Sequence, residues 1–256
     1  MAYNKAELSE SSENCSRMNL ATPKESKKPW LTQGEEKRLA VQEMFGQIAP
    51  GYDRMNRLMT ANFDRAWRRA AVGVLGVKPG ENALDLCCGT GDFIPILEKV
   101  GAKVVGVDFS LPMLEVAHDK FAAPLSLGDA CQLPLQSESV DVVTVGWGIR
   151  NVPDIDKAHR EIARVLKPGG RFVSLDMAVP PNAVVRGVSG LVTGKVLPRL
   201  GALLSNQEAY RYLPESTRRF MTREELKSSM EAAGFSDVQY RNFGFGNVCM
   251  HWGVKR

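Results

Sequence analysis

The chain lacks an apolar segment long enough to cross a membrane. Its 256 residues contain no run approaching the roughly 18–20 apolar residues that a spanning helix needs. Residues 1–34 are polar and have no hydrophobic signal core, and Glu7, Glu10 and Glu13 argue against an acid-poor organellar transit peptide. We therefore expect residues 1–34 to be a disordered extension, residues 35–256 to form one domain, and the protein to be cytoplasmic.

Cysteine and histidine are sparse and scattered. The five cysteines include no C-x-x-C pair, and the three histidines form no cluster with metal-ligand spacing, so no disulfide framework and no metal site is expected. Cys87 and Cys88 are interpreted as packed small side chains. His118 and His159 are expected on solvent-facing sides of helices, and His251 in a strand with a structural role. The net charge of +4 and the absence of a basic block with interleaved aromatics predict no nucleic-acid partner.

Apolar strands alternate with amphipathic helices along most of the chain. This pattern predicts an α/β fold with a mostly parallel seven-stranded sheet, closed by an antiparallel last strand. The expected helices are Glu35–Ile48, Arg65–Leu75, a segment opened by Asp92, Ser110–Phe121, Ile155–Leu166 and Thr222–Ala233. The expected strands lead into Asp85, end in Asp108, and cover Ser126–Ala130, Ser139–Trp147, Arg171–Met177, Ser236–Phe243 and Asn247–Val254. Residues 180–220 are expected to form a less regular insert.

A glycine turn follows the first strand, in ALDLCCGTGDF at 83–93. Gly89 and Gly91 can adopt positive φ and bring bare backbone close to a ligand. The dinucleotide fingerprint has a small residue three positions later, whereas this chain has Ile94. The flanking carboxylates of Asp85 and Asp92 would also repel a pyrophosphate. They suit S-adenosylmethionine, which carries positive charge, an amino group and a carboxylate.

Each part of this cofactor has a candidate partner at the carboxyl end of a strand. Asp85 is expected to face the ammonium group. Free N–H groups at the start of the helix are expected to bind the carboxylate. Asp108 is expected to bind the ribose hydroxyls, Asp129 the adenine amino group, and the Ala130 N–H a ring nitrogen. The alternatives are structural: Asp92 would cap a helix, and Asp108 and Asp129 would be turn residues.

The segment GIRN, at 148–151, follows the fourth strand and contains the best candidates for chemistry. A buried arginine is costly unless it meets an anion, and arginine cannot lose its proton and act as a base. Arg150 is therefore expected to stabilise a phenolate-type oxygen, by about 2.7–4 kcal/mol if it resembles an oxyanion-hole donor. The alternative is a structural salt bridge to the helix at Asp154–Leu166.

Several longer segments occur in order from about Phe45 to Val254. They are FGQIAPGYDRMNRLM, DLCCGTGD, VVGVDFSLPMLEVA, GDACQLPL, GIRNVPD, RVLKPGGRFV and EAYRYLPESTRRF. Together they resemble the ubiquinone/menaquinone biosynthesis C-methyltransferases. The resemblance implies a class I S-adenosylmethionine-dependent methyltransferase (Rossmann-like) fold and methylation of a ring carbon of a polyprenylated quinol. It places cofactor contacts on Thr90, Asp108, Asp129 and Ala130, with Arg150 aiding ring activation.

The chain departs from this family's usual pattern at two site positions. Gly146 stands where the family usually has a serine, and Asp176 where it has a glutamate. Within the domain we expect N-terminal helices over 35–77, a cofactor-binding core over 78–179, a substrate lid insert over 180–220, and a closing helix and strands over 221–256.

The catalytic candidates are Arg150, Asn151, Tyr210 and Asp53. The general base is open between Asp53, Tyr210 and a water held by Asn151, while Tyr52, Tyr210 and Tyr212 are candidates for lining the quinone pocket. The segment 190–204 mixes leucines with Lys195 and Arg199, so it is expected either to meet the prenyl tail or a membrane surface at its inner face, or to form a lid.

Several alternatives remain open at this level. The acceptor is a naphthoquinol (demethylmenaquinol), a methoxy-polyprenyl-benzoquinol, or both. Other hypotheses are a methyltransferase for another small hydrophobic acceptor, a non-catalytic cofactor-binding subunit of a biosynthetic complex, and an NAD-dependent oxidoreductase, which Ile94 disfavours. A homodimer is a further hypothesis on partners.

Overall fold

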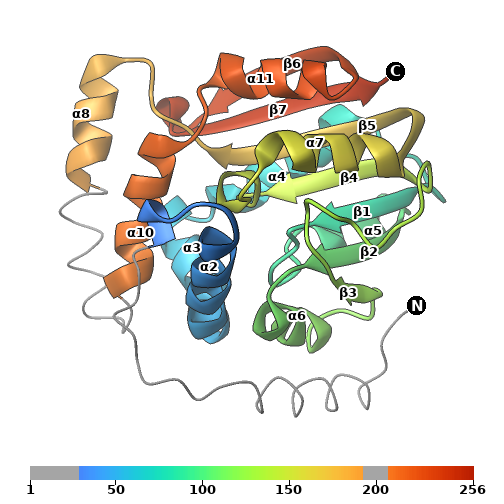
Figure 1. Ribbon diagram of the computed structural model, residues 1–256, viewed down its shortest axis with the longest axis horizontal. Coiled ribbons are helices and arrows are strands. Elements are labelled where there is room, and N and C mark those ends of the chain that lie inside the picture. Colours follow the sequence, from blue (N-terminus) through green and yellow to red (C-terminus); the bar gives the residue numbers. More distant parts are fainter. Residues whose placement is uncertain (1–28, 193–206) are drawn as a thin grey trace.

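The computed structural model describes residues 29–192 and 207–256 (Figure 1). Most of the predicted N-terminal extension, residues 1–28, and much of the segment 190–204 lie outside the described residues. The helices are η1 (Pro29–Leu31), α2 (Gly34–Ile48), η2 (Ala49–Gly51), α3 (Tyr52–Thr60), α4 (Phe63–Leu75), α5 (Ile94–Lys99), α6 (Leu111–His118), η3 (Ile149–Asn151), α7 (Ile155–Val165), α8 (Ala183–Leu191), α10 (Gln207–Arg219), α11 (Arg223–Ala232) and η5 (Gly244–Gly246). The strands are β1 (Asn82–Leu86), β2 (Lys103–Asp108), β3 (Leu125–Leu127), β4 (Val140–Gly146), β5 (Leu166–Met177), β6 (Phe235–Phe243) and β7 (Val248–Lys255).

The seven strands form one sheet in the order β3-β2-β1-β4-β5-β7-β6. The pairs from β3 to β5 are parallel, and β7 runs antiparallel to both of its neighbours. The predicted sheet, with its antiparallel last strand, is confirmed. The strand order reverses between β1 and β4, so their carboxyl ends open a crevice that in such sheets receives ligands.

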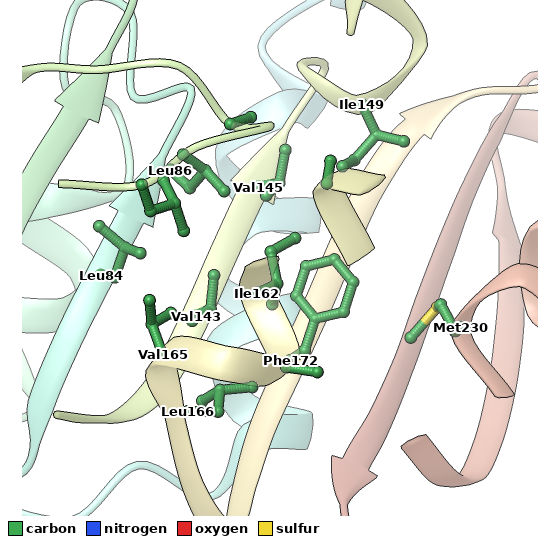
Figure 2. Close-up of a cluster of buried hydrophobic side chains, with 14 of the residues drawn as sticks. Leu84, Leu86, Val143, Val145, Ile149, Ile162, Val165, Leu166, Phe172 and Met230 are labelled. Carbon is green, nitrogen blue, oxygen red and sulfur yellow. The ribbon is translucent and has the colours of Figure 1, made fainter. Parts of the chain in front are cut away.

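Both faces of the sheet are covered by apolar side chains of helices. On one face, Leu84 and Leu86 of β1, Phe172 of β5, Ile162 of α7 and Met230 of α11 belong to a single buried cluster (Figure 2). The opposite face packs against α4 and α5. Because side chains alternate along a strand, Asp85 points to the α4 side while its two leucine neighbours point to the other.

A further group of helices covers the carboxyl ends of the parallel strands. In Figure 1, α2, α3, α8 and α10 gather at the end of the sheet to which β4 points. The α2 side chains Val41, Met44 and Ile48 are buried together with Met113 of α6 and Tyr212 of α10. This group lies over the crevice and supplies most of its outer walls.

One helix was missed, and two expectations about individual segments were wrong. The sequence pattern did not predict α3, and the insert at 180–220 contains two regular helices, α8 and α10. His159 is fully buried rather than solvent-facing, because α11 packs over it: its Nδ1 is 2.8 Å from the Ser229 hydroxyl of α11, and the burial lowers its pKa to about 4. Its position on α7 faces α11, which the α7 sequence by itself does not reveal.

Candidate active site

The turn after β1 has a backbone that favours glycine. Gly89 and Gly91 have φ of 54° and 84°, and Cys87 has φ of 52°. A Cβ at Gly91 would lie 2.8 Å from the Phe121 ring, so this glycine serves packing, whereas a Cβ at Gly89 would meet nothing within 4 Å. The turn therefore brings Gly89 to an open space at the end of the sheet.

That space is a cavity of about 660 Å³, counting its open mouth. We call it the inner cavity. Four predicted cofactor residues line it: Gly89, Asp108, Asp129 and Ala130. They lie at or just after the ends of β1, β2 and β3, and Gly146 at the end of β4 completes the row. The structure brings these four residues together because the carboxyl ends of neighbouring parallel strands meet at one edge of the sheet; their contacts with a cofactor remain predictions.

Asp108 joins the ends of β1 and β2. Its Oδ2 accepts a hydrogen bond from the Gly89 N–H at 2.8 Å, and its Oδ1 accepts one from the Ser110 N–H at 2.9 Å. Burial raises the pKa of this carboxyl to about 6, although the backbone hydrogen bonds act in the opposite direction. Each oxygen keeps a second lone pair. Asp108 can therefore hold the turn in place and still accept a hydroxyl of a ligand.

The other cofactor candidates lie behind the cavity wall. Asp85 is 1% exposed; its Oδ1 accepts a hydrogen bond from Thr144, and its buried Oδ2 has no partner among the described residues. The Thr90 hydroxyl donates to Asp53 at 2.5 Å. Asp92 pairs with Arg57 and Arg68 and does not cap a helix; α5 begins only at Ile94.

A second, larger cavity of about 1590 Å³, also counting its mouth, adjoins the first. We call it the outer cavity. Three aromatic residues, Phe45, Tyr52 and Trp147, line both cavities and form their common boundary. Four methionines and several aromatic side chains give the outer cavity a largely apolar wall: Met44, Met55, Met59, Met177, Phe63 and Trp67. A flat, apolar molecule fits such a wall.

Arg150 supplies a buried positive charge to the outer cavity. It is 8% exposed, and its Nη1 donates to Asp176 Oδ1 at 2.5 Å and to the Trp147 carbonyl at 2.8 Å. Burial works against the charge, but Asp176 and two nearby tyrosines leave the pKa of Arg150 above its usual value. Its buried Nε has no partner among the described residues. The alternative of a salt bridge to the helix at Asp154–Leu166 is not what the structure has: Arg150 pairs with Asp176 at the end of β5.

Asn151 orients a tyrosine beside this charge. Its Nδ2 donates to the Trp147 carbonyl at 2.9 Å, and its Oδ1 accepts the Tyr212 hydroxyl at 2.7 Å. Burial raises the pKa of Tyr212 to about 12, and burial also raises the pKa of Tyr52. Both phenols therefore stay protonated near neutral pH, which makes them hydrogen-bond donors and unsuitable as bases.

The two remaining catalytic candidates fare differently. Asp53 lines neither cavity; one of its oxygens accepts from Thr90, and the other pairs with Lys120 at 2.6 Å. Tyr210 belongs to α10, but its side chain lies outside the described residues. Sequence reasoning missed Phe45 and Trp147 as boundary residues. The apolar spacing of 35–48 predicts a buried Phe45 without indicating what it is buried against.

Comparisons with known proteins identify the family. The profile described as the ubiE/COQ5 methyltransferase family matches residues 31–255. The chain belongs to this family. It is 38% identical over 226 residues to a demethylmenaquinone methyltransferase of Lactiplantibacillus plantarum, a match that covers 84% of this chain and 95% of the relative. It is 42% identical over 223 residues to one of Staphylococcus aureus, covering 84% and 92%.

Solved structures of methyltransferases share the fold. A SAM-dependent methyltransferase from Thermotoga maritima superposes with a TM-score of 0.61 at 23% identity, covering 84% of this chain and 99% of that one. Phosphoethanolamine N-methyltransferase 2 of Haemonchus contortus, in complex with S-adenosyl-L-methionine, gives 0.56 at 21% identity, covering 74% and 52%. The predicted class I methyltransferase fold is confirmed.

As a member of the ubiE/COQ5 family, the chain is an S-adenosylmethionine-dependent methyltransferase. The inner cavity fits this donor on two observations. The Oδ2 of Asp85, in β1 directly before the cavity-lining Leu86, has no partner among the described residues, and both oxygens of Asp108 in the cavity wall keep a lone pair for a hydroxyl. The S-adenosylmethionine prediction is confirmed. The individual contacts remain predictions.

Proposed function

We propose that this methyltransferase acts on a ring carbon of a polyprenylated quinol, with demethylmenaquinol as its principal acceptor. The observation that carries this proposal is the position of Arg150, a buried cation in the wall of an apolar, aromatic-lined cavity that borders the donor cavity. An aryl oxygen that gains negative charge would be stabilised there. The names of the relatives, demethylmenaquinone methyltransferases, support the same acceptor.

The residues of the two cavities would divide the work. S-adenosylmethionine supplies an electrophilic methyl group on a sulfonium. Asp108, Asp129 and the Ala130 N–H would hold its nucleoside, and Phe45 and Trp147 would orient the acceptor ring at the boundary. Holding the two reactants in near-attack geometry away from water would supply most of the acceleration.

Arg150 would make the acceptor ring nucleophilic. A quinol hydroxyl resembles a tyrosine phenol, whose pKa is about 10, and a nearby guanidinium favours the ionised form. Charge on that oxygen delocalises onto the adjacent ring carbon, which then forms the new bond to the methyl carbon. Asp176 would keep Arg150 in place, and the Tyr212–Asn151 pair would keep the surrounding loop in place.

The proton of the hydroxyl would leave to a water molecule held near Asn151. Asp53 is less suited, because it lines neither cavity and both of its oxygens are engaged. The buried phenols of Tyr52 and Tyr212 are also unsuited, since burial raises the pKa of both. Water is thus the base that best fits the described residues.

The prenyl tail of the acceptor would leave the outer cavity between α8 and η5. Val188 and Val192 of this region line the cavity and are 59% and 42% exposed; Phe245 also lines it and is 88% exposed. No aspartate or glutamate occurs between Asp176 and Glu208, whereas Arg186, Lys195 and Arg199 do. A rim with exposed apolar side chains, next to Arg186 of α8, suits the surface of an anionic bilayer. Within the described residues no helix is long and apolar enough to cross a membrane.

A methyl-transfer assay tests the acceptor. The full chain is supplied with radiolabelled S-adenosylmethionine and, in separate reactions, with a reduced demethylmenaquinone and a reduced methoxy-polyprenyl-benzoquinone. We expect label in the ring-methylated naphthoquinol. Transfer to the benzoquinol alone would reassign the acceptor class. Absence of transfer to either one, with donor binding intact, would contradict the proposal and favour another hydrophobic acceptor or a non-catalytic role.

Vesicle flotation tests the rim. Val188→Asp and Phe245→Asp should each reduce recovery with vesicles containing anionic lipid, and both should still methylate a short-tailed demethylnaphthoquinol in detergent. Val74→Asp, at the far end of α4, replaces a 39% exposed valine and is the matched control. Equal recovery of all variants would contradict membrane contact at this rim.

A further inference from the structure

Arg68 is a buried cation whose role the methyl-transfer chemistry above does not explain. It lies on α4 and is 6% exposed. Its Nη2 donates to Asp92 at 3.1 Å, and its guanidinium carbon lies 4.8 Å from the centre of the Phe93 ring and 4.7 Å from that of Trp147. Two aromatic faces and one carboxylate therefore fix the orientation of the group.

Two nitrogens of Arg68 have no hydrogen-bond partner in the part of the chain that the structure describes. Its buried Nε has no hydrogen-bond partner, and its Nη1 makes none, among residues 29–192 and 207–256. A Cβ built on Gly146 would lie only 2.6 Å from Nη1. Gly146 and Trp147 line the inner cavity, while Arg68 itself lines the outer one. The guanidinium is thus at the boundary of the two cavities with unused donors.

The acidic side chains around Arg68 outnumber the basic ones. Asp92 is shared with Arg57, whose Nη2 is 2.6 Å from it, and Arg57 pairs with Asp64 as well. Asp85 is the remaining acid of the group, and the charge of Arg68 acts on it. Three acidic and two basic side chains therefore surround the boundary. With all of them ionised, their net charge of about −1 complements a ligand carrying two positive groups and one negative group.

We propose that Arg68 binds the carboxylate of the amino-acid end of S-adenosylmethionine, while Asp85 receives its ammonium group. The unused nitrogens of Arg68 and the unpartnered Oδ2 of Asp85 would bind the two ends of one zwitterion. This replaces the expectation that N–H groups at a helix start hold the carboxylate. α5 has only six residues, and the N–H groups of Gly91 and Ile94 are already bonded in the turn.

Calorimetric titration of the full chain tests this assignment without any acceptor present. The two ligands are S-adenosylmethionine and its decarboxylated form, which lacks only the carboxylate. The wild-type protein should bind the complete donor more tightly by about 10- to 100-fold, the range of a charged hydrogen bond. Arg68→Met should abolish most of that difference without weakening the decarboxylated ligand. Arg69→Met, an exposed neighbour with the same change of charge, should preserve it.

A structural role for Arg68 predicts a different pattern. If Arg68→Met weakens both ligands by the same factor, or weakens neither, the proposal is wrong. Should Arg68→Met not fold, Arg68→Lys decides. Lysine keeps a cation beside Asp92 but lacks the planar guanidinium, so the affinity ratio between the complete and the decarboxylated donor should fall by about 3- to 10-fold. If Arg68→Lys leaves the affinity ratio between the two ligands unchanged, the proposal is wrong. Because no quinol takes part, the outcome is independent of the acceptor assignment.

Discussion

The inner and outer cavities are assembled in different ways. Most of the inner cavity is lined by residues at or just after the ends of β1, β2, β3 and β4, with a few side chains of α2, α3 and α6, and the strand-end contacts involve backbone, as in the Gly89 N–H held by Asp108. The outer cavity is lined by side chains from α2, α3, α4, α8, α10 and η5, far apart in the sequence. Donor recognition thus depends on strand ends, and acceptor recognition on how helices pack over them.

This difference between the two cavities predicts which substitutions affect the donor and which affect the acceptor. Substitutions at strand ends should alter donor affinity, and substitutions on the covering helices should alter turnover with the acceptor. Arg68 and Arg150 are the exceptions that link the two regions. Arg68 lies on α4 and is proposed to bind the donor, whereas Arg150 follows β4 but points into the outer cavity, tied to the end of β5 by Asp176. A variant that changes both properties together would blur the division.

Arg150→Met should produce the largest effect. Loss of the cation beside the acceptor oxygen should lower turnover by about 10²- to 10³-fold, as for a lost oxyanion-hole donor, with donor affinity nearly unchanged. It also leaves Asp176 buried without its partner, so Arg150→Met/Asp176→Asn is examined in parallel to restore stability. Methyl transfer and calorimetry measure the two properties. Parallel losses in turnover and donor affinity would contradict the role, and Arg160→Met on exposed α7 surface is the control.

Asp108→Asn should have the opposite profile. The amide cannot accept from the Gly89 and Ser110 N–H groups as the carboxylate does, and it offers a ribose hydroxyl a weaker acceptor. Donor affinity should fall by about 10- to 100-fold, and turnover at saturating donor should change much less. Asp119→Asn, at an exposed position, is the matched control. A lower turnover at unchanged donor affinity would break the division between the cavities.

Tyr212→Phe should have a smaller effect, confined to the acceptor side. It removes one buried hydrogen bond to Asn151 Oδ1, which stabilises a protein by about 1 kcal/mol. We expect turnover to fall by about 3- to 10-fold at unchanged donor affinity, since this energy corresponds to roughly that factor. The measurements are steady-state methyl transfer and thermal unfolding. Tyr240→Phe, a 37% exposed tyrosine of β6, is the control; a shift in donor affinity would place Tyr212 on the donor side instead.

The smallest predicted effect is a proton linked to donor binding. Burial raises the pKa of Asp85 to about 7 from 3.8, partly offset by Arg68 and Thr144. An ammonium group facing this carboxyl favours its ionised form, so donor binding near pH 6.5 should release up to about one proton. Calorimetry in buffers of different ionisation enthalpy measures the release. Asp85→Asn should abolish it, and an unchanged release in that variant would assign the proton to another group.

The same group affects stability in a definite direction. Between about pH 4 and pH 7, folded Asp85 keeps a proton that the unfolded chain has lost. The folded state therefore binds more protons, and the free energy of unfolding of the donor-free protein should fall as pH rises through this window. Asp108, whose pKa burial raises to about 6, contributes in the same direction. Asp85→Asn should flatten the dependence without removing it.

Much of the donor site could be predicted from the sequence, because its residues are anchored to regular strands. Gly89 lies in a glycine turn directly after one strand, and Asp108 is the acid that ends the next strand. In a parallel sheet, this pattern places both residues at the same edge. Local spacing is enough for such a prediction. The partners of the buried charges could not be predicted in this way. The sequence suggested that Asp92 binds a ligand or caps a helix, whereas in the structure it pairs with arginines of α3 and α4.

By itself, the sequence determined the sheet, its antiparallel last strand and the position of the glycine turn, since strand periodicity and turn chemistry are local properties. Only the tertiary structure decided which side chains meet in the outer cavity and that Tyr212 bonds to Asn151. It also decided that Arg68 Nε and Asp85 Oδ2 are buried without a partner among the described residues. Those contacts join segments tens of residues apart. Their geometry follows from how the covering helices pack on one another and on the strand ends, which no local pattern specifies.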